Sequence, residues 1–372
     1  EARWDAPSCH WIVSTRDGTT FEAQSLVSAT GQLSRPFRPN LPGIERFAGI
    51  VFHSAEWRHD YDLRGKCVAV IGTGASAIQC VSKLSVYQRS AAYVLPKPDK
   101  TYPRWQRTLF EHLPGALWLS RAITYVEHEM FAFVFSYWRS ALRVKRWAFF
   151  RHLRQGIEDP ELRRRLVPHY RIGCKRILLS NDFYPAMGRP NVDLITDAIK
   201  EIKPNAIVAV DGTEHKADCI IFGTGFAATD FLAPIKVSGV GGKDLHQAWS
   251  SGAEAHLGIT IAGFPNFFML YGPNTNIAHN SVIYMIECQI RYVMACLKRL
   301  HGDDIRSLEI RPEVQDRYNS RMQQRLKQTV WARGCTSWYL TAAGRNTTNW
   351  PGYSLEFRLR TQAPKWDDYA IH

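Results

Sequence analysis

The sequence lacks the cysteine patterns that hold metal ions or support dithiol chemistry. Its eight cysteines include no C-x-x-C pair, and none has zinc-ligand spacing with a histidine. Several lie in apolar, strand-like segments, where a free cysteine behaves as a small hydrophobic residue. We therefore predict no metal site, free thiols and a reducing, cytoplasmic compartment, and we exclude a dithiol–disulfide reductase.

Long apolar runs are also missing. A bilayer-spanning helix needs roughly eighteen or more apolar residues in succession, and the most apolar stretch, 130–138, is far shorter and is followed at once by Arg139. The first ten residues are polar and do not resemble a signal peptide. The sequence therefore predicts no transmembrane segment.

Positive charge is in excess, but it is not gathered into runs. The formal net charge is +13, and many of the basic residues lie between positions 104 and 176, interspersed with aromatic and acidic residues. No nucleic-acid recognition motif accompanies them, so we do not expect a nucleic-acid partner. Most of these cations we interpret as solvated helix faces, while a phosphate-bearing cofactor would need only two or three of them.

A glycine turn typical of dinucleotide-binding domains follows a short apolar strand. The strand C-V-A-V-I ends at Ile71, and G-x-G-x-x-A then leads into an apolar helix start. In this motif the glycines allow a tight turn and close approach to a pyrophosphate, which faces the helix N-terminus. The residues predicted to contact the cofactor in this turn are Gly72, Thr73, Gly74, Ser76 and Ala77.

The end of the next predicted strand indicates which nucleotide binds. An NAD site has an acidic residue there, whereas this chain has Arg89 followed by Ser90. A guanidinium suits a 2′-phosphate, so we predict NADPH rather than NADH; the alternative is a surface arginine at a strand end. Gly72 and Arg89 are only seventeen positions apart, so about six to eight residues of the usual crossover are absent after Val81.

A strand–turn–strand pattern that closes on Thr-Gly occurs twice. It reaches Gly31 in the first copy and Gly225 in the second, and the turn glycine lies thirteen positions earlier in both. In each copy we predict one continuous return strand, over 20–29 and over 216–222. Such patterns end dinucleotide-binding domains in two-nucleotide flavoproteins, so the chain has two domain endings and one beginning. We expect the other beginning to precede Glu1, and we place Gly225 near a cofactor.

A fingerprint upstream of the glycine turn indicates a family. The pattern F-x-G-x-x-x-H-x-x-x-W resembles that of the Baeyer–Villiger monooxygenases, with Arg58 as a small departure from the usual Pro or Asp. The related N- and S-oxygenating flavin monooxygenases usually have Tyr or Phe at the last position. The resemblance implies that these residues hold an interdomain linker: Phe47, Gly49, His53 and Trp57.

The resemblance also assigns cofactors and site residues. It implies FAD and NADPH, with Lys175 joining Arg89 and Ser90 around the 2′-phosphate, and with Arg176 as the catalytic residue that reaches the flavin. A fixed guanidinium would stabilise the anionic oxygen that develops there. Asn274 lies in a segment that lines the flavin in similar proteins, and Trp338 is expected near the nicotinamide ribose. The family's aspartate beside this arginine is absent.

The fold class predicted is α/β, with two Rossmann-like domains of the glutathione-reductase type. We expect a remnant of the FAD domain and a linker over 1–50, an NADP domain over 51–222 and the C-terminal part of the FAD domain over 223–372. A helical insertion is expected over about 100–172, where the aromatic residues serve packing or line a substrate site.

The function implied is insertion of one oxygen atom from O2 into a ketone, through a flavin C4a-peroxide, to give an ester or lactone. Two alternatives remain open. One is an N- or S-oxygenating flavin monooxygenase. The other is a non-catalytic NADP-binding remnant, because the glycine turn for FAD is missing from this sequence. Ketone and O2 are the expected small-molecule partners.

Overall fold

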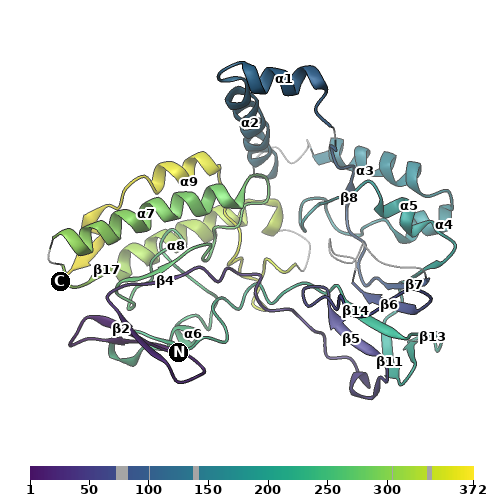
Figure 1. Cartoon of the computed structure of the whole chain (residues 1–372), viewed down its shortest axis with the longest axis horizontal. Coiled ribbons are helices and arrows are strands. Elements are labelled where there is room, and N and C mark those ends of the chain that lie inside the picture. The colour runs from purple at the N-terminus through teal and green to yellow at the C-terminus, as the bar shows by residue number, and fades with distance from the viewer. Residues whose placement is uncertain (73–82, 100, 137–141, 304, 333–336) are drawn as a thin grey trace. The chain divides into compact units, whose positions relative to one another are not determined.

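The computed structural model describes residues 1–72, 83–99, 101–136, 142–303, 305–332 and 337–372. The fold is mixed α/β, which confirms the predicted class (Figure 1). The chain forms two compact units, and each is described by itself. Unit 1 comprises Glu1–Ser34, Tyr102–Arg139 and Ala227–His372, and unit 2 comprises Arg35–Thr101 and Ser140–Phe226.

Unit 2 is built on a five-stranded sheet in which every neighbouring pair is parallel, in the order β10-β7-β6-β14-β5. Its central strands are continuous apolar runs, as expected where helices or a second layer cover both faces. The strand order is that of a doubly wound nucleotide-binding domain. The strands are β5 (Ile50–His53), β6 (Cys67–Ile71), β7 (Lys83–Tyr87), β10 (Val192–Ile195) and β14 (Cys219–Phe222).

A three-stranded antiparallel layer covers this sheet. Apolar side chains of both layers, among them Ile207 and Ile220, form one buried core. The smaller elements of unit 2 are β8 (Val94–Leu95), α3 (Leu142–Gly156), α4 (Pro160–Arg165), β9 (Leu178–Leu179), α5 (Phe183–Met187), β11 (Ile199–Lys203), β12 (Ala206–Ala209) and β13 (Glu214–Lys216).

Unit 1 has two apolar cores. One lies under the sheet β15-β1-β2-β3 and includes the fully buried Trp11, and the other lies between α7, α8 and the pair β17-β18. The strands are β1 (Ala2–Asp5), β2 (His10–Ser14), β3 (Thr20–Ala23), β4 (Leu26–Ser28), β15 (Val237–Ser238), β16 (Phe267–Met269), β17 (Leu308–Ile310) and β18 (Tyr369–Ile371). The helices are α1 (Arg104–His112), α2 (Ala116–Ser136), α6 (Leu245–Ala248), α7 (Val282–Gly302), α8 (Pro312–Lys327) and α9 (Ser354–Arg360).

The two predicted return strands are each broken, which corrects the expectation of continuous strands over 20–29 and 216–222. In both copies the chain leaves an antiparallel hairpin and enters a parallel pair. β3 pairs with β2 and β4 with β16, just as β13 pairs with β12 and β14 with β6. In the second copy the break is fixed by Asp218, whose carboxylate accepts the Cys67 backbone N–H at 2.8 Å. The two copies of the internal repeat therefore share one feature: in each, the chain passes from one sheet to another.

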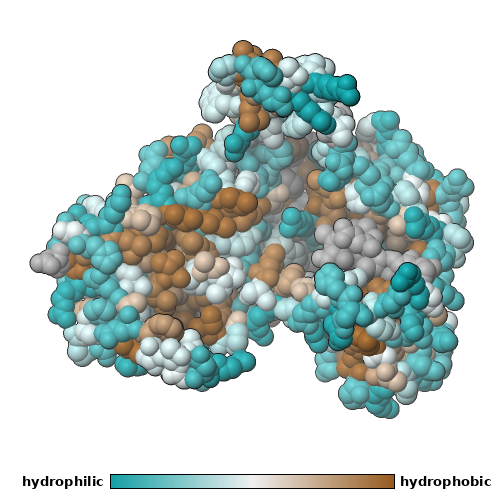
Figure 2. Space-filling view, in the orientation of Figure 1, coloured by the Kyte–Doolittle hydropathy of each residue, from teal (hydrophilic) through white to brown (hydrophobic). Residues whose placement is uncertain are grey.

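The surface of unit 1 carries apolar side chains over α7 (Figure 2), where Ile283, Ile290 and Met294 are exposed. Among the described residues, no helix combines the length and the hydropathy that a bilayer crossing requires. The predicted cytoplasmic location stays a prediction. Cys174 is disulfide-bonded, which corrects the expectation of free thiols throughout, while five other described cysteines are free.

Candidate nucleotide and flavin sites

The glycine turn lies at the point where the strand order of the unit 2 sheet reverses. Gly72 follows β6 with φ +107°, and a Cβ built on it would lie 2.5 Å from the carbonyl oxygen of Gly223, which follows β14. Only glycine allows the two strand ends to approach so closely. In doubly wound sheets, ligands bind at this position, beyond the carboxyl ends of the strands. Thr73, Gly74, Ser76 and Ala77 and the shortened crossover lie outside the described residues.

The three residues expected around a 2′-phosphate are brought together at the same edge of unit 2. Arg89 and Ser90 follow β7 after one intervening residue and are exposed, whereas Lys175 is half-buried. The Lys175 Nζ donates to the Ser90 Oγ at 3.5 Å and lies 4.8 Å from the centre of the Tyr170 ring. Burial, together with the nearby Arg89 guanidinium, lowers the pKa of Lys175. Two cations held near each other in this way would be stabilised by an anion placed between them.

Arg176 follows Lys175 directly but does not share its contacts. Its side chain is exposed, and no hydrogen bond or ion pair holds its guanidinium among the described residues. It lies just before β9, in the loop that begins at the buried Gly173. Its guanidinium is therefore free to contact a ligand.

The fingerprint residues form a compact corner at β5. A Cβ on Gly49 would lie 2.3 Å from the Asp218 carbonyl oxygen and 2.7 Å from the Phe47 ring, so any other residue would clash there. Phe52 and Trp57 make an edge-to-face contact with ring centres 5.3 Å apart. Close packing therefore explains three residues of the fingerprint. Phe47 packs on Gly49 before β5 begins, and Trp57 packs on Phe52 near the end of β5.

His53 is fully buried at the end of β5, opposite Phe222 of β14. Its Nδ1 accepts the Ala55 backbone N–H at 3.1 Å, and its ring makes an edge-to-face contact with Phe226 at 5.6 Å. The other nitrogen, Nε2, lies near the Gly225 backbone but forms no hydrogen bond of normal geometry. Burial lowers the pKa of His53. Its neutral ring therefore packs the β5 and β14 ends against the linker, as a positioning residue would.

Gly225 holds the same linker through its backbone. With φ +79°, it adopts a conformation that favours glycine, and its carbonyl oxygen accepts the Phe37 backbone N–H at 2.8 Å. The neighbouring Thr224 hydroxyl donates to the Phe37 carbonyl oxygen. The second Thr-Gly ending is therefore tied to the chain that leads into β5.

In unit 1, Asn274 joins the loop that the family resemblance places near the flavin to a second loop, which contains Asn346 and Asn349. Its Nδ2 donates to the carbonyl oxygens of Asn346 and Asn349 at 3.0 and 3.1 Å, and Asn276 Nδ2 donates to Asn349 Oδ1 at 2.8 Å. Several buried polar atoms in these loops nevertheless have no hydrogen-bond partner. They are Asn274 Oδ1, Asn346 Nδ2, Thr347 Oγ1 and Asn349 Nδ2. Buried polar groups of this kind are stabilised when a ligand supplies the missing partners.

Trp338 is half-buried and lies in unit 1, with its ring 4.5 Å from that of Tyr339. Tyr339 is buried and in turn contacts Trp331 edge to face. These contacts show aromatic packing, and they leave part of the Trp338 ring accessible.

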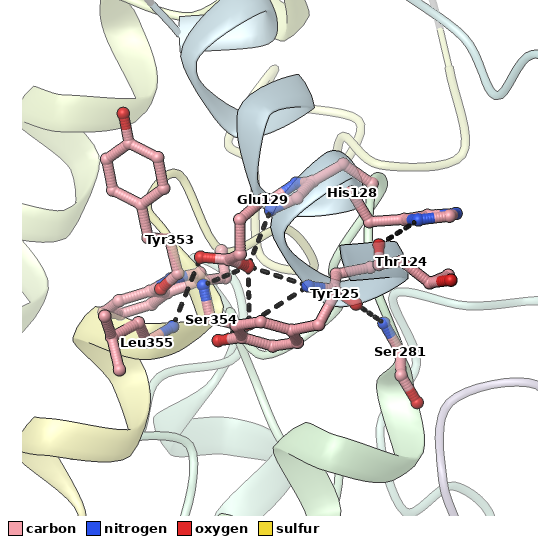
Figure 3. Close-up of polar contacts among 11 residues, drawn as sticks. Thr124, Tyr125, His128, Glu129, Ser281, Tyr353, Ser354 and Leu355 are labelled. Carbon is pink, nitrogen blue, oxygen red and sulfur yellow. Dashed lines mark hydrogen bonds and ion pairs between the residues drawn. The ribbon is translucent and has the colours of Figure 1, made fainter. Parts of the chain in front are cut away.

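Sequence reasoning missed Glu129, a buried carboxylate in unit 1 (Figure 3). It extends from α2 toward the N-terminus of α9, where Oε1 accepts the Ser354 hydroxyl at 2.5 Å and the Ser354 backbone N–H at 3.1 Å. Asn280 Nδ2 donates to the same oxygen at 2.8 Å. Burial would raise the pKa of Glu129, but the His279 imidazole, 3.7 Å away, and the hydrogen bonds from Ser354 and Asn280 outweigh it and lower the pKa to about 2.

The Glu129 contacts fix α2 to the rest of unit 1. A carboxylate at the N-terminus of α9 satisfies backbone donors that would otherwise lack partners and interacts favourably with the helix dipole. Tyr125, one turn earlier on α2, adds a hydrogen bond to the Ser354 Oγ at 3.0 Å. The spacing of Tyr125 and Glu129 on one helical face was the signal available in the sequence.

Comparison with known proteins gives the same result from sequence and from structure. A family model described as flavin-binding monooxygenase-like matches residues 5–237. A Baeyer-Villiger monooxygenase of Pseudomonas aeruginosa is 44% identical, in an alignment that covers 99% of this chain and 71% of the relative. A Baeyer-Villiger monooxygenase of Streptomyces coelicolor is also 44% identical, over 99% of this chain and 72% of the relative.

Solved structures resemble the whole chain. The cyclohexanone monooxygenase from Rhodococcus sp. Phi1 bound to NADP+ matches with a TM-score of 0.87 and 24% identity, over 100% of this chain and 79% of that one. A steroid monooxygenase bound to NADP matches with a TM-score of 0.84 and 27% identity, over the same shares of the two chains.

Proposed function

The chain belongs to the flavin-binding monooxygenase-like family, in its Baeyer–Villiger group, and we propose that it inserts one oxygen atom from O2 into a ketone to give an ester or lactone. As a member of this family it is a flavin-dependent NADPH monooxygenase that uses FAD. When bound, FAD accepts the hydride of NADPH and activates O2, while the protein supplies binding, orientation and charge.

The observation that carries the nucleotide part of this proposal is the cluster of Arg89, Ser90 and Lys175. It lies in unit 2, whose parallel sheet has its switch point at Gly72. The Ser90 hydroxyl and the two cations suit a phosphate monoester, because charged hydrogen bonds to phosphate are short and strong. We assign these three residues to the 2′-phosphate of NADPH and the Gly72 turn to its pyrophosphate.

The loops around Asn274 are the part of unit 1 that fits a flavin. Their buried, unpartnered amide and hydroxyl groups provide both donors and acceptors, as the edge of an isoalloxazine ring requires. We assign Trp338 to the nicotinamide ribose, since its ring is partly accessible.

Arg176 is the residue that we assign to the oxygen chemistry. Its exposed guanidinium has no protein partner among the described residues. A guanidinium that contacts the reacting oxygen stabilises negative charge that develops there during the addition to the ketone. His53, Gly49 and Gly225 act as positioning groups that hold the linker at the end of β5.

The direct test is product analysis with labelled oxygen. The natural protein, loaded with FAD, is supplied with NADPH, ¹⁸O2 and a panel of cyclic and linear ketones. The expected product is an ester or lactone that carries one ¹⁸O atom, formed with ketone-dependent oxidation of NADPH. Oxidation of an added amine or sulfide, with every ketone left unchanged, would instead assign the chain to N- or S-oxygenation.

A further inference from the structure

A cavity of about 450 Å³ opens in unit 1 between α8, the end of α9 and the chain before β18. We propose that this cavity binds a small organic polyanion, recognised through phosphate or carboxylate groups. All of its lining residues lie in unit 1, whereas the phosphate cluster of the nucleotide site lies in unit 2. Its volume is within the range of small-molecule sites.

Cations line the cavity from two sides. Arg317, Arg321 and Arg325 are spaced four residues apart on α8, so they share one face of the helix. Arg360 and Lys365 contribute from the end of α9 and the segment after it. Guanidinium groups in a row present paired N–H donors that match carboxylate and phosphate oxygens.

These cations are only partly neutralised by the protein. Glu356 binds Arg325 at 2.7 Å and Arg360 at 2.9 Å, and Asp368 also lines the cavity. Arg317, Arg321 and Lys365 form no ion pair with any described residue. Positive charge therefore remains in excess in this cavity, and a bound anion would relieve the repulsion among the cations.

The cavity also offers polar groups that lack partners. His256 is nearly buried, with 8% exposure, and its Nδ1 has no hydrogen-bond partner. The buried Tyr318 hydroxyl is likewise unpartnered, and the two rings are in edge-to-face contact at 5.1 Å. A hydroxyl donor near the guanidinium groups would give an anionic ligand a neutral hydrogen bond in addition to the charged ones.

Two of the cavity's cations also affect the pKa of His256. Burial, with smaller contributions from Arg360 and Lys365, lowers the pKa of His256 to about 4. The imidazole is therefore neutral near pH 7, and one ring nitrogen can accept a hydrogen bond from a protonated group of the ligand while the other donates.

The test is calorimetric titration of the natural protein with inorganic pyrophosphate and, separately, with citrate. Saturable binding of one molecule per chain is expected for at least one probe, and the probe that binds distinguishes phosphate from carboxylate recognition. The double variant Arg317→Gln/Arg321→Gln should weaken that binding at least about tenfold, since each charged hydrogen bond contributes on this scale. Both side chains are exposed, so the fold is expected to persist, and a thermal unfolding curve checks it.

Lys327→Gln is the matched control, because Lys327 is an exposed cation on the same helix but does not line the cavity. Its affinity should stay within about twofold of the natural protein, because screened surface charges contribute little. Titrations are repeated in the variant Arg89→Gln/Lys175→Gln, which removes the cations of the nucleotide site. Binding that persists in this variant is binding at the unit 1 cavity. Absence of binding with both probes, or an equal loss in Lys327→Gln, would overturn the proposal.

Discussion

The Lys175 Nζ lies 3.5 Å from the Ser90 Oγ, although 85 positions separate the two residues in sequence. The contact joins two loops of unit 2, one after β7 and one before β9, at the edge proposed to bind the 2′-phosphate. Arg89 lies close enough to help to lower the pKa of Lys175. Two cations beside a hydroxyl suit one phosphate group, which is the role proposed for them, and the first prediction follows from this arrangement.

Replacement of Arg89 by glutamine should weaken NADP+ binding and leave NAD+ binding nearly unchanged, since only NADP+ carries the 2′-phosphate. The expected loss is about 10- to 100-fold in Kd, the contribution of a charged hydrogen bond. Fluorescence or calorimetric titration with both nucleotides measures it. Arg64→Gln, at an exposed ion pair with Asp62 in the same unit, serves as control. Equal losses for NADP+ and NAD+ would show that Arg89 does not contact this phosphate.

The glycine turn and Arg89 could be predicted from the sequence because their signals are local, whereas Lys175, 85 positions from Ser90, was placed beside them only by the family resemblance. The apolar strand ending at Ile71, the glycine turn and Arg89 at the end of the next strand all occur within a short stretch, and the parallel topology brings their ends to one edge. The broken return strands were not accessible in this way. Apart from Asp218, the residues from Ala217 to Phe222 are apolar, and only the pairing partners show that the chain changes sheet at this position.

Glu129 marks the other limit of sequence reasoning. Its partner Ser354 lies 225 positions away. The spacing of Tyr125 and Glu129 places both on one helical face, but it does not indicate which distant residue they contact. The same applies to the cavity beside α8, whose cations resemble a solvated helix face until His256 and the end of α9 are placed opposite them. Long-range packing decides such sites, and composition does not reveal it.

Glu129→Gln should destabilise unit 1 in a pH-dependent manner. The pKa of Glu129 falls from an ordinary 4.5 to about 2 in the folded chain, so its stabilisation is fully present above about pH 4.5 and is lost as pH falls toward 2. The expected loss for the variant near pH 7 is about 3 kcal/mol. Urea unfolding at several pH values measures this. The exposed Glu127, on the same helix, supplies the control Glu127→Gln, whose stability should follow that of the natural protein. A constant difference between Glu129→Gln and natural protein from pH 7 to pH 3 would contradict the linkage.

Gly49→Ala should destabilise unit 2, because the added methyl would lie 2.3 Å from the Asp218 carbonyl oxygen. Overpacking against backbone costs about 1–3 kcal/mol. Thermal or denaturant unfolding tests this, with Gly302→Ala as control, since a Cβ on Gly302 meets no heavy atom within 4 Å. If Gly49→Ala unfolded like the control, the glycine of the fingerprint would need an explanation other than close packing.

Arg176 tests the assignment of oxygen chemistry to unit 2. Arg176→Ala should lower kcat for ketone oxygenation about 100-fold or more, the usual effect of removing a group that stabilises developing negative charge. Arg176→Lys keeps the charge but loses the planar pair of donors. Its kcat should therefore lie between that of the natural protein and that of Arg176→Ala. The Kd for NADP+ should stay within about threefold in both variants, because Lys175, Arg89 and Ser90 remain. Arg171→Ala, at an exposed position of the preceding loop, controls for the loss of one surface cation. Natural turnover in Arg176→Ala, measured by product formation, would remove this residue from the mechanism without affecting the nucleotide assignment.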